Sequence, residues 1–531
     1  MTAFQTPHIE YGQISPVLIV IGVAVVGVLV EAFVARRLRY VVQAGLAMAG
    51  LVAALVAAVV VFVQMNPGSD HPKTGKLVAM GAMALDGPTL VCWVLILALG
   101  LLSVFLFAER RLEGGVTAFA GQAAALPGTE AEREASTRGL EHTEIFPLLL
   151  FSISGMLIFP ASNDMITMFV GLEVLSLPLY LLCGLARHRR LLSQEAAMKY
   201  FLLGAFSSGF FVYGIALVYG YAGSMGFAQI AQAVSGRTSG QALLVGGMAL
   251  MAVGLFFKIG AVPFHSWKPD VYQGAPTAVT GFMAVATNVA AFGALLRLFY
   301  VAFGGARWDW TPMFWVIAII TMVVGSVLAL SQTDMKRLLA YSSIAHAGFV
   351  LVGLLGARSL GALSQGEIAP VQAVLFYLIT YGLMTIAAFA IVTVVRDSGG
   401  EANGFNRWTG LGKQSPLVAG MFAFLLLGMA GIPLTSGFTG KWAVFASALS
   451  AGAWPLVVIA VLSSAIAAAF YIRVIVLMFF VEPVEEGGVS IAIPSVLTKS
   501  VVAIGVTGTL VLGVVPGPLL HLLGNVGVFV R

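Results

Sequence analysis

Apolar runs recur along almost the whole sequence and set its fold class. Each run is roughly 20 residues long, enough to cross the hydrocarbon core of a bilayer as a helix, and about 14 such runs follow one another. Only 10% of the 531 residues are Asp, Glu, Lys or Arg, which is too little polar surface to solvate a globule of this size. The sequence therefore predicts an all-α polytopic membrane protein with about 14 transmembrane helices, forming a single membrane domain over residues 1–531.

The basic residues between the runs predict the orientation of the chain. With an even number of spans, the connections alternate between two sides, and Lys and Arg concentrate on one of them. That side is expected to be cytoplasmic, which places both termini outside. The cytoplasmic group is Arg36, Arg37, Arg39, Arg110, Arg111, Arg133, Arg138, Arg187, Arg189, Arg190, Lys268, Lys336, Arg337, Arg396, Arg407, Lys413 and Lys499. The opposite group is Lys73, Lys76, Arg237, Arg297, Arg307, Arg358 and Arg531.

Other features of the composition exclude several kinds of function. The longest polar insertion, residues 109–142, is predicted to be a cytoplasmic loop without a core of its own. The net charge of +5 is spread over the connections, so the expected partner is the lipid bilayer and not nucleic acid. Cys92 and Cys183 stand apart in apolar runs without CxxC spacing, which argues against iron-sulfur, zinc and disulfide roles. Any redox chemistry is therefore expected on another chain, with no cofactor bound here.

Two parts of the chain share a spacing that indicates an internal repeat. Asp164 and Asp334 each begin an apolar run, and Pro263 and Pro433 each interrupt a later one, 99 residues further on in both cases. The predicted topology starts the first unit outside and the second inside, so the units are expected to be inverted repeats, at approximately residues 145–310 and 311–481. In such proteins, interrupted helices line the ion path, because unwound backbone is tolerated in the membrane only inside protein or beside water.

Three ionisable side chains stand inside apolar runs, where each costs several kcal/mol unless it has a function. Glu173 lies nine residues after Asp164, about 13 Å along a helix and so near mid-membrane. Lys258 precedes Pro263 and is expected to exchange a proton, although its long side chain could also snorkel to an interface. Lys441 follows Pro433 and is interpreted as the counterpart of Lys258 in the second repeat. Glu173 could alternatively serve only as a structural partner of one Lys or Arg.

Two further residues are candidates for the same path. His346 lies about 15 Å into an apolar run, one turn after Ser342 and Ser343, and could hand protons between the halves. A neutral, packed histidine that is hydrogen-bonded between helices is an equally good interpretation. Lys199 follows Gln194 and Glu195 closely, and interfacial anchoring is favoured for it over a place in the path.

Four segments carry a resemblance to a known family. They are GLEVLSLPLY around Glu173, KIGAVPFHSWKPDVYQGAP from Lys258, QTDMKRLLAYSSIAHAG around His346 and GIPLTSGFTGKW around Lys441. In this order, over roughly residues 145–480, they resemble the antiporter-like membrane subunits of respiratory complex I. SLPLY and VPFHSWKPDVYQGAP are most similar to the N-type subunits. L-type subunits carry a long C-terminal lateral helix, and M-type subunits typically have a glutamate where Lys441 stands.

The resemblance implies 14 helices with two inverted five-helix repeats, and a proton path in which Glu173 and Lys258 form a coupled pair. It implies other membrane subunits of a bacterial complex as partners, with flavin, iron-sulfur clusters and quinone on other subunits. The family has a further lysine where this sequence has Asn288, which can order water but cannot hold a proton at neutral pH. Either water and His346 connect Lys258 to Lys441, or the central relay is weakened.

The leading hypothesis is therefore a proton-translocating subunit of NADH-quinone oxidoreductase in the bacterial inner membrane. A subunit of a multi-subunit cation/proton antiporter is the alternative, and a purely structural extension of a membrane arm is a third.

Overall fold

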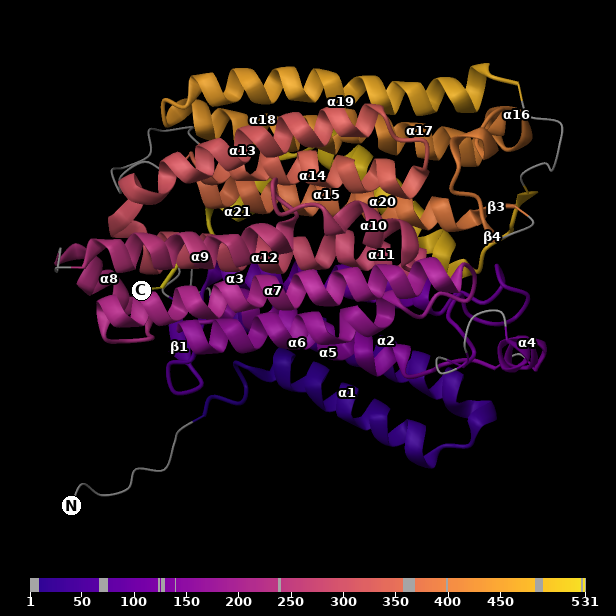
Figure 1. The fold of residues 1–531 in the computed structure, drawn as a ribbon, viewed down its shortest axis with the longest axis horizontal. Helices are drawn as coiled ribbons and strands as arrows, with labels where there is room; N and C mark the ends of the chain where they lie inside the picture. Colours follow the sequence, from indigo (N-terminus) through magenta and orange to yellow (C-terminus); the bar gives the residue numbers. More distant parts are fainter. Residues whose placement is uncertain are drawn as a thin grey trace.

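The computed structural model describes residues 9–65, 75–122, 125, 129–138, 140–236, 240–356, 368–397, 400–482, 490–526 and 529–530. Long helices run side by side across the molecule, from α1 at one edge to α19 at the other (Figure 1). Twelve described helices are long and apolar enough to cross a membrane, and two shorter apolar helices, Ile145–Ala161 and Pro416–Ala430, join them. The prediction of an all-α polytopic membrane protein is confirmed.

The elements follow one another along the chain in four groups. The first contains α1 (Ser15–Phe33), α2 (Arg36–Gln64), the antiparallel strands β1 (Lys76–Val78) and β2 (Met83–Leu85), α3 (Gly87–Phe107) and the short α4 (Glu130–Thr137). The second contains α5 (Ile145–Ala161), α6 (Met165–Cys183), α7 (Arg190–Ala222), α8 (Phe227–Ser235), α9 (Gln241–Ile259), α10 (Trp267–Gly274), α11 (Thr277–Phe282), η1 (Met283–Thr287), α12 (Asn288–Arg297) and η2 (Leu298–Ala302).

The third group contains η3 (Gly304–Ala306), α13 (Arg307–Leu330), α14 (Met335–Leu354), α15 (Pro370–Val394), η4 (Phe405–Arg407), α16 (Leu411–Gln414), α17 (Pro416–Ala430), α18 (Ser436–Ser450) and α19 (Trp454–Phe480). The fourth contains α20 (Val496–Val514) and α21 (Gly517–Gly524). Strand β3 (Val395–Asp397) pairs antiparallel with both β4 (Gly400–Glu401) and β5 (Ser490–Ile491).

Helices α6 and α14 begin in the same way, at Asp164 and Asp334. The Asp164 carboxylate accepts from the Thr167 amide, and the Asp334 carboxylate accepts from two amides of the first turn of α14. Such caps satisfy N–H groups that a helix start leaves unpaired. Each aspartate also pairs through its backbone with a glycine much further along, Asp164 with Gly226 and Asp334 with Gly404. The two starts thus share both a local and a long-range anchor.

The two starts lie at opposite ends of the bundle. The amide of Asn163, the residue before Asp164, donates to the carbonyl oxygen of Ala82, which lies beside β2. The backbone of Asp334 instead pairs with Gly404, close after β4. Strand β1, the partner of β2, and strand β4 lie at opposite ends of the molecule (Figure 1). Each unit later contains a broken helix, α9 followed by α10 and α17 followed by α18. The units therefore run in opposite directions.

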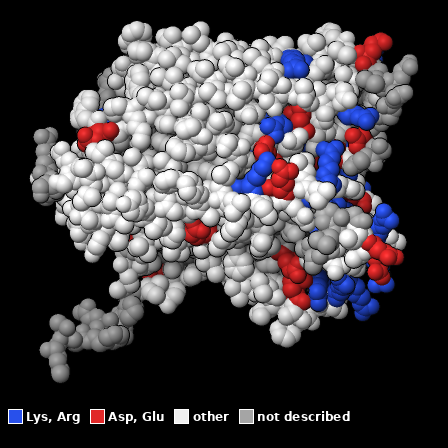
Figure 2. All heavy atoms as spheres, viewed as in Figure 1, with Lys and Arg blue, Asp and Glu red and all other residues white. Residues whose placement is uncertain are grey.

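Charged side chains gather at one end of the molecule, beside β3 and β4, while most of the face in view is uncharged (Figure 2). This distribution fits a broad apolar belt against lipid or neighbouring chains. The described parts of the polar segment 109–142 pack onto this end more closely than a free loop would. Phe119 is fully buried against Phe107, with ring centroids 5.0 Å apart. The Glu109 carboxylate accepts hydrogen bonds from Ser495 and Thr498 at the start of α20.

Arg297 corrects one assignment made from the sequence. The charge pattern placed it in a connection outside the membrane, but its side chain is completely buried. Its guanidinium donates to Asp86 at 2.7 Å and to the carbonyl oxygen of Pro160 at 2.7 Å. Asp86 caps α3, so this ion pair joins the start of α3 to the end of α12. The charge is tolerated inside because a counter-charge and hydrogen bonds compensate it.

Removing the counter-charge should destabilise the fold strongly. Asp86→Asn keeps a capping side chain but leaves the Arg297 guanidinium uncompensated, so the free energy of unfolding should fall by roughly 3–5 kcal/mol. The double variant Asp86→Asn/Arg297→Gln should recover part of the loss. Thermal unfolding in detergent can be followed by reaction of the buried Cys92 with a thiol-reactive fluorophore. Lys499→Met, on an exposed position of α20, is the control, and an unchanged melting temperature for Asp86→Asn would contradict the role of the pair.

Candidate functional site

Lys258 is buried in the last turn of α9, with 4% of its surface exposed. Its Nζ has no hydrogen-bond partner among the described residues. It lies 5.5 Å from the ring centroid of Tyr200 and 5.8 Å from that of Tyr180, within the range at which an aromatic face attracts a cation. The ammonium is therefore surrounded mainly by aromatic rings.

Glu173 stands on α6, half-buried, and its Oε1 also lacks a hydrogen-bond partner within the described part of the chain. Its carboxylate is near enough to interact electrostatically with Lys258. No ion pair of 4 Å or less joins these two described residues, however, so the coupled pair that the resemblance implies is not in contact in this conformation. A modest movement of α6 or α9 would change the strength of their interaction.

The first helix break is built around Gly260 and Lys268. Helix α9 ends at Ile259 because Gly260 takes a left-handed conformation, with φ of 74°. Lys268, on α10, reaches back across the break and donates from Nζ to the carbonyl oxygen of Ile259 at 2.9 Å. It is 1% exposed, so it lies inside the bundle and not in a polar connection, where its place among the cytoplasmic charges had put it. The polar run HSWKPD is typical of a connection, but here it folds back into the bundle. The signal in the sequence that could have indicated the burial of Lys268 is its position five residues after the interrupting Pro263.

The second break repeats this arrangement with Lys441. Helix α17 ends at Ala430, and Gly431 takes a φ of 88°. Lys441, on α18 and 5% exposed, donates to the carbonyl oxygens of Met429 at 3.0 Å and Ala430 at 2.9 Å. These last carbonyls carry partial negative charge, so they stabilise an ammonium. Lys441 also donates to Ser464 at 2.8 Å.

The counterpart of Lys441 in the first repeat is therefore Lys268. The interpretation of Lys258 as that counterpart was wrong. Both Lys268 and Lys441 follow their break and bind the end of the preceding half-helix. Lys258 precedes its break and binds no carbonyl among the described residues. The order of residues in the sequence concealed this, because only the fold shows which lysine turns back.

His346 is the centre of a buried cluster of hydroxyl groups on α14, α15 and α19. It is 2% exposed, with Nδ1 2.7 Å from the hydroxyl of Tyr377 and Nε2 3.2 Å from that of Tyr471. The Tyr471 hydroxyl also bonds to Ser342, and the ring of Tyr381 stacks on the imidazole at 4.6 Å between centroids. These groups can hold and exchange a proton. The three tyrosines were not identified from the sequence, because only the tertiary structure brings them next to His346.

Asn288 is buried, at 4% exposed, directly after the π-helical turn η1. Its Nδ2 donates to the carbonyl oxygen of Ala284 on its own helix at 2.8 Å. Its Oδ1 has no partner among the described residues. The side chain therefore forms no hydrogen bond to the His346 cluster or to either lysine in this part of the structure.

Lys199 lies apart from these groups, at the edge of the bundle. Its side chain is 42% exposed and its Nζ lies 2.8 Å from both Glu195 and Asp270. Asp270 also receives a hydrogen bond of 2.7 Å from Arg337. This cluster ties α7, α10 and α14 together, which agrees with anchoring and not with a buried relay.

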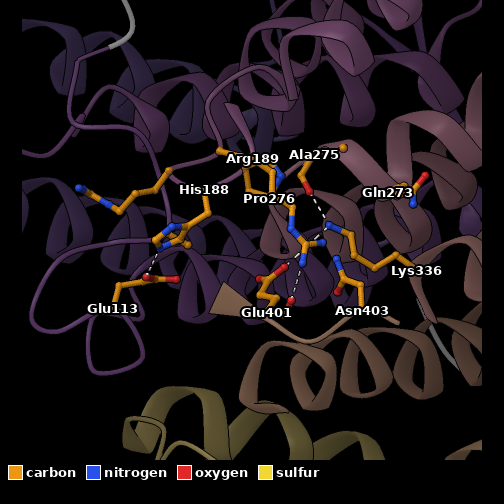
Figure 3. A pocket seen from close by; sticks show the side chains of 13 residues that line it. Glu113, His188, Arg189, Gln273, Ala275, Pro276, Lys336, Glu401 and Asn403 are labelled. Carbon is orange, nitrogen blue, oxygen red and sulfur yellow. Dashed lines mark hydrogen bonds and ion pairs between the residues drawn. The ribbon is translucent and has the colours of Figure 1, made fainter. Parts of the chain in front are cut away.

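A pocket opens at the charged end of the molecule, with an empty volume of about 430 Å³. Its polar lining includes Glu113, His188, Arg189, Lys336, Glu401 and Asn403 (Figure 3). Lys336 is 2% exposed; its Nζ donates to the carbonyl oxygen of Ala275 at 2.6 Å and lies 3.9 Å from Glu401. The C-terminal end of α10 reaches the pocket, since Gln273 and Gly274 line it. Water and protons can thus approach α10 from this end.

Glu113 should make stability depend on pH. Burial raises the pKa of this carboxyl, but bonds from His188 and Arg396 hold the pKa below its usual value. A lowered folded-state pKa stabilises the fold above the unfolded pKa of about 4.3, and this contribution is lost as the pH falls through the folded value. Glu113→Gln should therefore lower the free energy of unfolding at pH 7 by roughly 1–3 kcal/mol, and with it the melting temperature.

The difference between Glu113→Gln and the parent should persist to about pH 5 and shrink below about pH 4. Intrinsic tryptophan fluorescence during heating measures it across a pH series. Glu134→Gln, on the exposed α4, is the matched control. A difference that grows as the pH falls would contradict this account of Glu113.

Residues 162–467 match the family model described as NADH:quinone oxidoreductase/Mrp antiporter, transmembrane. The sequence is 63% identical to NADH-quinone oxidoreductase subunit N of a Nocardioides species, over 99% of this chain and 100% of that protein. A chain of respiratory complex I from Thermus thermophilus matches with a TM-score of 0.72 and 32% identity, over 95% of this chain and 98% of that one. A chain of the Mrp complex from a Dietzia species shares the fold, with a TM-score of 0.79, 21% identity and coverage of 98% and 97%.

Proposed function

The chain belongs to the family of membrane subunits shared by NADH:quinone oxidoreductases and Mrp antiporters, and from this premise we propose that it translocates protons as one membrane-arm subunit of a bacterial NADH-quinone oxidoreductase. The resemblance to N-type subunits is confirmed by the identity of 63% over nearly the whole chain. The similarity to the Thermus complex I chain supports neighbouring membrane subunits as the partners.

The observation that carries the proposal is the set of buried protonatable side chains along the two repeats. Lys258, His346 and Lys441 are each at most 5% exposed, in a setting where an unneeded charge is costly. The Tyr377 and Tyr471 hydroxyls bonded to His346 provide further sites through which a proton can pass. A structural extension of the membrane arm would need none of these groups.

Glu173 gives Lys258 a way to be switched. A carboxylate that approaches the lysine stabilises its ammonium form, and a carboxylate that moves away favours release of the proton. The released proton passes toward His346 and then to Lys441, whose ammonium the half-helix carbonyls stabilise. Quinone reduction elsewhere in the complex would drive the movement.

The redox groups belong to other subunits in this proposal, so the chain takes part in the oxidoreductase without a redox centre of its own. Its two cysteines stand apart in the sequence, which supports placing flavin, iron-sulfur clusters and quinone elsewhere. The charged end with β3 and β4 is proposed to face the cytoplasm, with both termini outside, because Lys and Arg prefer cytoplasmic connections.

Removing either member of the switch should impair pumping. In an assembled complex, Lys258→Met and Glu173→Gln should each lower the rate of proton pumping by at least about tenfold, because a positioned acid or base is lost. Quenching of a ΔpH-sensitive dye in inverted membrane vesicles measures pumping, with NADH oxidation measured in parallel. Lys499→Met controls for the loss of an exposed lysine. Full pumping by assembled Lys258→Met and Glu173→Gln complexes would refute the role assigned to them.

Asn288 offers a test in the opposite direction. Asn288→Lys restores a protonatable group to the central helix, so pumping should stay intact or increase. The matched variant Asn288→Gln keeps an amide and controls for side-chain length. A strong loss of pumping in Asn288→Lys, with Asn288→Gln active, would show that this site needs an uncharged amide.

The alternative is that the chain is a subunit of a multi-subunit cation/proton antiporter. The observation that favours this alternative is the fold that the chain shares with a chain of the Mrp complex. Copurification distinguishes the two. Flavin and iron-sulfur absorbance in the complex isolated through a tag on this chain supports the oxidoreductase, and a complex without either supports the antiporter.

A further inference from the structure

Lys268 is a buried lysine that the path through Lys258, His346 and Lys441 does not use. We propose that Lys268 is an additional proton-carrying site, which connects the first repeat to the His346 cluster through Tyr272 and Ser343 and so replaces the lysine that is missing at Asn288. The inference rests on the proposed function and deepens it.

The surroundings of Lys268 are those of a proton site and not of an ordinary structural cation. It is 1% exposed, and its hydrogen bond among the described residues is to the Ile259 carbonyl oxygen at 2.9 Å. No carboxylate lies within ion-pair distance of it among the described residues. An ammonium held by a neutral carbonyl and an aromatic ring can lose its proton without leaving a buried carboxylate unpaired.

The symmetry of the repeats gives the second argument. Lys268 and Lys441 occupy equivalent places, each beyond a left-handed glycine and each on the carbonyl end of the preceding half-helix. A methyl group on Gly260 would lie 2.6 Å from Cδ of Lys268, and one on Gly431 would lie 3.0 Å from Cδ of Lys441. Both breaks are therefore shaped around a lysine, and if Lys441 carries protons, the same chemistry is available to Lys268.

A route leads from Lys268 to the second repeat. Its Nζ lies 5.7 Å from the ring centroid of Tyr272, one turn later on α10. The buried Ser343 hydroxyl lies near Tyr272 and Tyr381, and it has no hydrogen-bond partner among the described residues. Tyr381 stacks on His346. These buried polar groups lead from α10 to the His346 cluster, and water between them would complete the connection.

The other end of α10 faces the pocket at the charged end of the bundle. Gln273 and Gly274 line the pocket, and the neighbouring Ala275 accepts from Lys336. Lys268 thus stands about 9 Å along a helix from a solvent-accessible opening. Asn288, in contrast, donates to its own helix and contributes no proton-binding group.

The step is a simple proton relay without electron transfer. One N–H bond of the Lys268 ammonium breaks, and the proton passes toward the hydroxyls of Tyr272 and Ser343. The neutral amine then forms a new N–H bond with a proton that arrives from the pocket. The side chain returns to its starting state with one proton moved.

Two substitutions separate proton carrying from helix capping. Lys268→Met removes the charge at similar length, whereas Lys268→Arg keeps a cation and donors for the Ile259 carbonyl but does not release a proton near neutral pH. Both should lower pumping per NADH oxidised by at least about tenfold in assembled complexes. The rescue variant Lys268→Met/Asn288→Lys should regain most of the pumping. Lys499→Met is the control for an exposed lysine.

Full pumping by Lys268→Arg would overturn the proposal, since it would show that Lys268 only caps α9. Failure of the rescue variant, once assembled, would overturn the claim that Lys268 replaces a lysine at position 288. The proposed function is tested separately in the same vesicles. If Lys258→Met and Lys441→Met lose pumping but both Lys268 variants retain it, the proposed function stands and the inference about Lys268 fails. If none of these variants loses pumping, the proposed function itself fails.

Discussion

The need to solvate charge inside a hydrocarbon environment governs this structure. A buried ammonium has to be stabilised by the protein itself, and the cheapest source of negative potential in an apolar helical bundle is the carbonyl end of a helix. Gly260 and Gly431 create such ends at mid-bundle by turning the chain into a left-handed conformation. Lys268 and Lys441 then fold back onto the carbonyls that become available. The broken helices and the buried lysines are therefore parts of one arrangement.

The same constraint shapes the region between the two helix breaks. Between the breaks, α14 and α15 carry His346 and two of the tyrosines, with Tyr471 contributed by α19. Tyrosine hydroxyl groups form hydrogen bonds with both ring nitrogens of His346 without adding charge, so the cluster can remain buried. Asn288 satisfies itself on its own helix. We therefore place the proposed connection between the repeats on α10 and α14, and not on the central helix that carries Asn288.

Much of the fold follows from local patterns in the sequence. Apolar runs of spanning length predict the helices, and the Gly and Pro interruptions near residues 263 and 433 predict the breaks. Both can be predicted because they depend on the sequence of a single helix. The buried positions of Lys258, His346 and Lys441, and the half-buried position of Glu173, follow from their apolar neighbours. The burial of Lys268 does not, since it stands beside polar residues typical of a connection. Arg297 was assigned to a connection from the charge pattern alone, and its burial depends on tertiary contacts. The tyrosines around His346 are hidden for the same reason, because they come from distant helices.

The most direct test of the account is a high-resolution cryo-EM map of the assembled complex that shows ordered water inside this chain. The account predicts a continuous chain of water and hydroxyl groups from the pocket past Lys268, Tyr272 and Ser343 to His346 and Lys441. A dry apolar gap between Lys268 and Ser343, with ordered water at Asn288 instead, would contradict it.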